Sequence, residues 1–109
     1  MLNKDIINLK NLVKLSVKQL HNKNQFVIYF NDSNGNKVIA FQSYHTLIAI
    51  YHPIQQKLFI NYHYWDYSKT TLKHLKLFIN EYTTFDYYTK AGFIGEIKRN
   101  DNIIFFSEN

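Results

Sequence analysis

Apolar residues spaced three and four positions apart predict two helices. The first spans residues 5–20, and its apolar stripe consists of Ile6, Leu9, Val13, Val17 and Leu20. Its lysines fall on another face of the helix: Lys10, Lys14 and Lys18. The second helix spans residues 68–82, where Leu72, Leu75, Ile79 and Tyr82 repeat at the same spacing, and Asp66 or Ser68 is placed to cap its first turn.

Two β-rich runs, residues 25–31 and 37–42, flank a polar segment and predict a hairpin. The segment contains Asn34-Gly35, a pair that favours a two-residue turn because both residues tolerate a positive φ. With that turn, Phe30 faces Ile39 and Ile28 faces Phe41. We therefore expect these four side chains on one side of the ribbon, in the core.

Residues 43–52 and 57–65 predict a second, central hairpin around Pro53, which cannot extend a β-ladder. Its register places Ala49 opposite Ile60 and Ile50 opposite Phe59. Both faces of this hairpin are partly apolar. We expect helices over one face, and aromatic rings or another chain over the other, so that a homodimer is one expected assembly.

The C-terminal region predicts a short helix and a last hairpin. Thr84 or Asp86 is placed to cap a segment that runs to Lys90 and ends near Gly92. Residues 93–98 and 102–107 then form the expected terminal hairpin. The fold class that follows is α+β: one domain over residues 1–109, with a mostly antiparallel sheet of five or six strands, an N-terminal helix and a longer helix after the central hairpin.

Composition narrows the class of protein. A chain of 109 residues with 17% aromatic residues and one proline is expected to fold as one domain. Without cysteine it has no disulfide framework, thiolate metal site or cysteine nucleophile. Its apolar runs are too short to span a bilayer and its start does not resemble a signal peptide, so we expect a cytoplasmic protein without a membrane partner. The net charge of +5 favours anionic partners slightly, but all basic residues except Arg99 are lysine, a bias typical of AT-rich coding.

The residues that carry most catalytic chemistry are scattered along the sequence. The five histidines have no helical i, i+4 pair, and the carboxylates fall mostly at predicted turns. No serine lies in a Gly-x-Ser-x-Gly elbow, and the three glycines form no phosphate-binding loop. We therefore expect a protein that is not an enzyme and that has no cofactor, catalytic residue or metal site.

The densest chemistry lies in residues 62–76, where aromatic rings and hydroxyls precede a basic helical face. The candidate partner-binding residues there are Tyr64, Trp65, Tyr67, Lys69, Lys73 and Lys76. Exposed rings beside lysines can stack bases and follow a phosphate backbone, and tyrosine and tryptophan also anchor protein interfaces. The alternative is structural, because a strand that enters a helix often buries its rings beneath that helix while the lysines face solvent.

Two segments of the chain resemble segments of known proteins. Ser43-Tyr44-His45-Thr46-Leu47-Ile48-Ala49 and the Trp65-Asp66-Tyr67-Ser68-Lys69-Thr70-Thr71-Leu72-Lys73 segment resemble small uncharacterised proteins of phages and other mobile elements of Gram-positive bacteria. Accessory proteins of such elements include inhibitors of host defence, among them anti-CRISPR proteins. The resemblance implies a non-enzymatic protein that sterically inhibits a host nucleic-acid enzyme, for example a CRISPR effector nuclease. The alternative is direct binding of single-stranded DNA or RNA by the same aromatic and basic surface.

Overall fold

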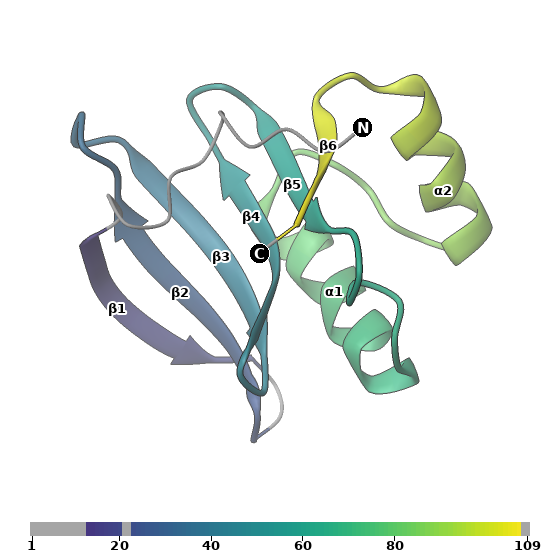
Figure 1. Cartoon of the computed structure of the whole chain (residues 1–109), viewed down its shortest axis with the longest axis horizontal. Helices are drawn as coiled ribbons and strands as arrows, with labels where there is room; N and C mark the ends of the chain where they lie inside the picture. The colour runs from purple at the N-terminus through teal and green to yellow at the C-terminus, as the bar shows by residue number, and fades with distance from the viewer. Residues whose placement is uncertain (1–12, 21–22, 108–109) are drawn as a thin grey trace.

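The computed structural model describes residues 13–20 and 23–107, and these form one small α+β domain with a Cα radius of gyration of 12.8 Å. The strands are β1 (Val13–Gln19), β2 (Gln25–Asn31), β3 (Lys37–Ser43), β4 (Thr46–His52), β5 (Lys57–Asn61) and β6 (Ile103–Phe106). The helices are α1 (Lys69–Tyr82) and α2 (Lys90–Arg99). All six strands belong to one sheet (Figure 1).

Strand order in the sheet follows chain order, from β1 at one edge to β6 at the other. Neighbours from β1 to β5 are antiparallel, as expected for strands that short turns connect. After β5 the chain forms α1 and α2 before it returns as β6, which pairs with β5 in parallel. A parallel neighbour needs such a long connection, so the last strand depends on both helices.

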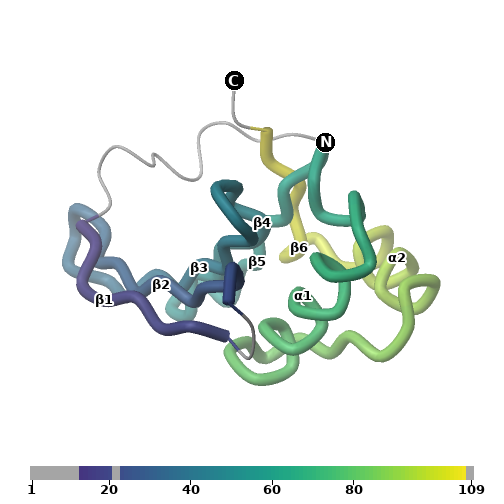
Figure 2. The backbone as a smooth tube through the Cα atoms, turned by 90° about the horizontal axis from the view of Figure 1, so that it is seen from below, coloured from purple at the N-terminus to yellow at the C-terminus, as the bar shows by residue number. Residues whose placement is uncertain are grey.

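Both helices pack on the same face of the sheet, as Figures 1 and 2 show. The periodicity of α1 aims Leu75, Phe78 and Ile79 at the sheet, and all three are fully buried. The ring of Phe78 stacks on that of Phe41 in β3, with centroids 5.8 Å apart. This main core places the start of α1 beside the end of β3.

The opposite face of the sheet is also apolar. Alternate residues of the central strands point to it, and Val38, Ala40, Ile50 and Phe59 are almost completely buried there. No helix among residues 13–20 and 23–107 packs on this face. The expectation of a two-sided apolar sheet is therefore confirmed, and the homodimer stays a prediction.

The predicted N-terminal helix is wrong for the part that the structure describes. Residues 13–19 form β1, an exposed edge strand, whereas residues 5–12, with Lys10, lie outside the described residues. Val13, Leu15 and Val17 alternate with polar residues, so the same stretch also has the period of a strand. The segment forms a strand because it pairs with β2.

The first hairpin forms, but in a register one residue from the expected one. Phe30 pairs with Val38 and Ile28 with Ala40, so neither Phe30 nor Ile28 shares a face with Ile39. The cause is Asp32, whose Oδ1 accepts hydrogen bonds from the backbone amides of residues 34 and 36 at 2.9 Å. This Asx turn, in which only the glycine has a positive φ, replaces the two-residue turn with a longer loop.

The central hairpin has the expected register, with Ala49 opposite Ile60 and Ile50 opposite Phe59. Its two strands are shorter than predicted. Residues 44 and 45 form a turn between β3 and β4, and the residues after Asn61 leave the sheet. This early exit from β5 frees the aromatic segment to form a loop.

The expected terminal hairpin is wrong, because residues 93–98 lie in α2 and only β6 is a strand. The N-cap of α2 is Thr89, whose hydroxyl accepts a hydrogen bond from the amide of Gly92, rather than Thr84 or Asp86. Two glycines inside α2 lower the intrinsic helix propensity of this segment, so the sequence does not predict a helix there. Burial of Phe93 against the main core compensates for that weakness.

Candidate aromatic and basic interface

Residues 62–68 form the loop between β5 and α1, and Asn61 anchors it. The side chain of Asn61 donates a hydrogen bond to the carbonyl of Leu47 at 2.8 Å and accepts one from the amide of His63 at 3.1 Å. The carbonyl of Asn61 accepts a further bond from the amide of Trp65. The loop is therefore a defined series of turns that fixes the direction of each ring.

Trp65 points inward from this loop and is only 6% exposed. Its ring lies 6.0 Å from that of Phe93 and 6.5 Å from that of Phe105, both measured between centroids. Lys90 holds its ammonium 5.6 Å from the centre of the same ring and 3.3 Å from the Asp66 carboxylate. Of the candidate partner-binding residues, Trp65 therefore belongs to the core of the fold.

The tyrosines on either side of Trp65 point outward. Tyr64 and Tyr67 are 48% and 67% exposed, and their rings meet edge to face with centroids 6.2 Å apart. Tyr62 is exposed as well. The structure thus brings two of the three aromatic candidates together on the surface and separates them from the third.

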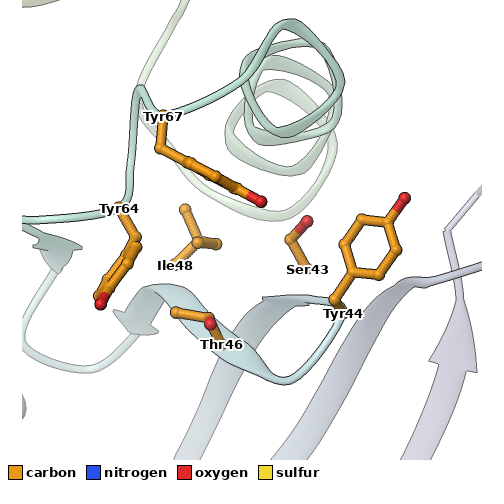
Figure 3. Close-up of a pocket in the computed structure, with 6 residues that line it drawn as sticks. All are labelled: Ser43, Tyr44, Thr46, Ile48, Tyr64 and Tyr67. Atoms are coloured by element: carbon orange, nitrogen blue, oxygen red, sulfur yellow. The ribbon is translucent and has the colours of Figure 1, made fainter.

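These two tyrosines line a pocket that the end of the β3–β4 hairpin completes (Figure 3). The hairpin contributes Ser43, Tyr44, Thr46 and Ile48, and the pocket volume is about 130 Å³. In Figure 3 the ring of Tyr67 extends across the pocket towards Ser43, and Tyr44 lies on the far side. No pattern in the sequence joins these residues to the aromatic segment, because only the sheet register brings the hairpin turn beside the loop.

Tyr44 occupies a strained position in this turn. Its φ is 55°, in the left-handed region where a bulky residue is unusual and where asparagine or glycine is favoured. Its amide donates to the carbonyl of Asn24 at 2.7 Å, and its carbonyl accepts from the side chain of Gln42 at 2.7 Å. These bonds hold the ring half-exposed at the pocket, and backbone strain of this kind is concentrated at functional sites.

The first turns of α1 carry three exposed lysines. The helix begins directly after Ser68, whose hydroxyl accepts the amide hydrogen of Thr71 at 3.0 Å. Lys69, Lys73 and Lys76 are exposed on the face of α1 opposite its buried stripe. No described carboxylate forms an ion pair with these lysines, and the first turn contains no acidic residue. We name Tyr44, Tyr64, Tyr67, Lys69, Lys73 and Lys76 the tyrosine–lysine surface.

Two buried histidines form contacts within the fold. His52 Nε2 lies 3.1 Å from a carboxylate oxygen of Asp32, and the Nδ1 of buried His74 lies 2.9 Å from the carbonyl of Thr70. Hydrogen bonds from the amide of Asn36, and then the contact with His52, hold the pKa of Asp32 below its usual value. Within the described part of the chain, no three histidine or carboxylate groups converge on a point that could hold a metal ion.

Burial raises the pKa of Tyr87, and the nearby charge of Asp66 adds to this effect. The Tyr87 ring stacks on Phe93 with centroids 4.7 Å apart, so the raised pKa reflects the position of Tyr87 in the core. None of the helices described in the structure is long and apolar enough to cross a membrane.

Comparison with known proteins gives a family without an activity. The sequence profile of DUF8033, a family of unknown function, matches residues 9–96. No curated protein and no protein of solved structure matches the chain.

Proposed function

Because the chain belongs to the DUF8033 family, whose function is unknown, its own surface has to indicate a role, and we propose that it is a non-enzymatic binding protein. It binds a nucleic-acid enzyme of the bacterium that is host to the phage or mobile element. A CRISPR effector nuclease is the concrete example. The contact is the tyrosine–lysine surface. The observation that carries the proposal is that exposed tyrosine rings are followed along the chain by exposed lysines that form no ion pair with a described carboxylate.

The chemistry of this surface suits an interface with a protein that binds nucleic acid. Tyrosine contributes a large contact area with few rotatable bonds, and such residues dominate the binding energy of many interfaces. Lysines around the rings attract a partner with a negative potential, and this applies equally to an acidic surface and to a bound nucleic acid. The inhibition is steric: the domain blocks a channel or a movement that the enzyme needs.

A cleavage assay with a panel of purified CRISPR effector nucleases tests the proposal. We expect the protein to slow cleavage by one of them, and Tyr64→Ala with Tyr67→Ala to weaken that inhibition by about tenfold or more, as removal of interface anchors does. The matched controls are Ile54→Ala and Lys37→Gln. Both residues are exposed and lie at the far ends of β4 and β3 from the pocket.

A panel in which no nuclease is slowed would remove the CRISPR example. Equal weakening by the surface variants and by the controls would show that the tyrosine–lysine surface is not the contact.

A second candidate function is direct binding of single-stranded DNA or RNA. The combination of exposed tyrosine rings with lysines that pair with no described carboxylate favours it, since base stacking and phosphate contacts are how such strands are bound without sequence readout. This function predicts an affinity that falls steeply with salt, because each phosphate contact releases a counterion. A titration of labelled oligonucleotides at low and at moderate salt measures it.

A further inference from the structure

The pocket drawn in Figure 3 is about the size of one six-membered ring. Its volume is about 130 Å³, and an engineered cavity of about 150 Å³ is known to hold benzene. A fused two-ring system needs considerably more space. We propose that this pocket binds the base of an unpaired pyrimidine nucleotide in a single strand of nucleic acid.

The walls of the pocket suit the faces and the edge of such a base. Tyr44, Tyr64 and Tyr67 provide aromatic rings, and Ile48 provides an apolar contact between them. The side-chain hydroxyls of the three tyrosines form no hydrogen bond with another described residue. Each can therefore donate to, or accept from, the polar edge of a base.

No charged side chain lines the pocket, but exposed lysines follow its residues closely along the chain. Lys69 follows Tyr67 by two residues, and Lys73 lies one turn further along α1. Neither lysine forms an ion pair with a described carboxylate. A single strand of nucleic acid offers both kinds of group, an uncharged base for the pocket and phosphates along the strand for the exposed lysines at the start of α1.

An aromatic side chain of a protein partner would also fit the pocket, but it carries no anion of its own, so the lysines would need a separate acidic side chain. The nucleotide satisfies both parts of the site. The inference rests on the proposed function, because it uses the same surface and names the strand held by the inhibited enzyme as part of what that surface contacts.

Fluorescence anisotropy with labelled oligonucleotides of about 12 residues tests the inference, since binding sites of this kind cover about 4–16 nucleotides. Three strands are compared at low salt: oligothymidine, oligoadenosine and an abasic strand with the same phosphate backbone. We expect oligothymidine to bind about tenfold more tightly than the abasic strand, the gain typical of one stacked base, and more tightly than oligoadenosine.

Protein variants separate the base from the phosphates. Tyr44→Asn removes a ring but suits the positive φ, so it should fold and bind oligothymidine no better than the abasic strand. Lys69→Gln should weaken all three strands by the same factor, because it removes a phosphate contact. Ile54→Ala should change nothing.

Equal binding of oligothymidine and the abasic strand, or tighter binding of oligoadenosine, would overturn the inference. So would unchanged binding by Tyr44→Asn. If no strand binds while nuclease inhibition persists, the occupant is a protein side chain and the proposed function stands without the nucleotide. If oligothymidine binds as expected but no nuclease in the panel is slowed, the CRISPR example fails and the inference remains.

Discussion

Replacing Trp65 with alanine separates the part of the aromatic segment that holds the fold from the part that is free to bind. A buried tryptophan removes about 200 Å² from water, worth at most about 5 kcal/mol at 25 cal/mol per Å². Large aromatic-to-alanine changes in cores cost about 3–5 kcal/mol, and the lost contacts with Phe93 and Phe105 place Trp65→Ala in that range. For a domain of this size the loss lowers the unfolding temperature by about 15–30 °C.

The assay is urea unfolding followed by far-ultraviolet circular dichroism, with thermal unfolding as a second measurement. Tyr67→Ala is the matched control, because it removes an exposed ring two residues away and should stay within about 0.5 kcal/mol of the unmodified chain. Trp65→Phe keeps a ring against Phe93 and should recover most of the lost stability. A free energy of unfolding for Trp65→Ala within about 1 kcal/mol of the unmodified protein would refute the assignment of Trp65 to the core.

Three further changes test local features. Ser68→Ala removes the N-cap of α1 and should lower the free energy of unfolding by about 1 kcal/mol, measured by urea unfolding; no loss would mean that the cap is dispensable. Asp32 has a pKa lowered mainly by the Asn36 amide and then by His52, so its stabilisation exists above its unfolded pKa and is lost as the pH falls below about 4. Asp32→Asn should therefore unfold with a flatter dependence on pH in that range, and an unchanged acid limb in thermal unfolding would contradict this. Tyr44→Asn should raise the free energy of unfolding by about 1 kcal/mol through relief of backbone strain, whereas a loss in urea unfolding would show that packing of the ring outweighs the strain.

The elements that could be predicted from the sequence are those whose hydrophobic spacing and turn residues fit only one type of secondary structure. In α1 the apolar spacing, the cap at Ser68 and the length all favour a helix, and the helix forms with the expected bounds within one residue. The central hairpin has a proline that fixes its turn, and the register around Ala49 and Ile60 follows. In both elements local and tertiary preferences agree.

The elements that could not be predicted are those in which tertiary contacts choose between two patterns. Residues 13–19 fit a helical and a strand period equally well, and the edge of β2 selects the strand. Gly92 and Gly95 disfavour a helix, but burial of Phe93 supports α2 against the core. Strand β6 pairs in parallel with β5 across the 41 residues that separate Asn61 from Ile103, and no local pattern in the sequence indicates such a pair.

The candidate site was accessible to sequence reasoning only in its contiguous part. Tyr64, Tyr67 and the lysines of α1 lie within one segment, and rings followed by a basic helical face are visible as a pattern. Tyr44 reaches the pocket from a different hairpin. The position with positive φ in its turn is Tyr44 itself rather than glycine or asparagine, so the sequence does not mark the turn. The pocket exists because β3 and β4 deliver that turn to the start of α1, which is a property of the sheet.

Fold and site share one short segment, and this determines how variants of the segment have to be interpreted. Burial of Trp65, with Lys90 and Asp66 beside it, holds the loop in the conformation that turns Tyr64 and Tyr67 outward. A Trp65 variant that loses binding therefore loses it through the fold, and its unfolding curve shifts with its affinity. Variants of exposed Tyr64 and Tyr67 should lose affinity at constant stability. This difference distinguishes a binding surface from a set of rings that merely lies above the core.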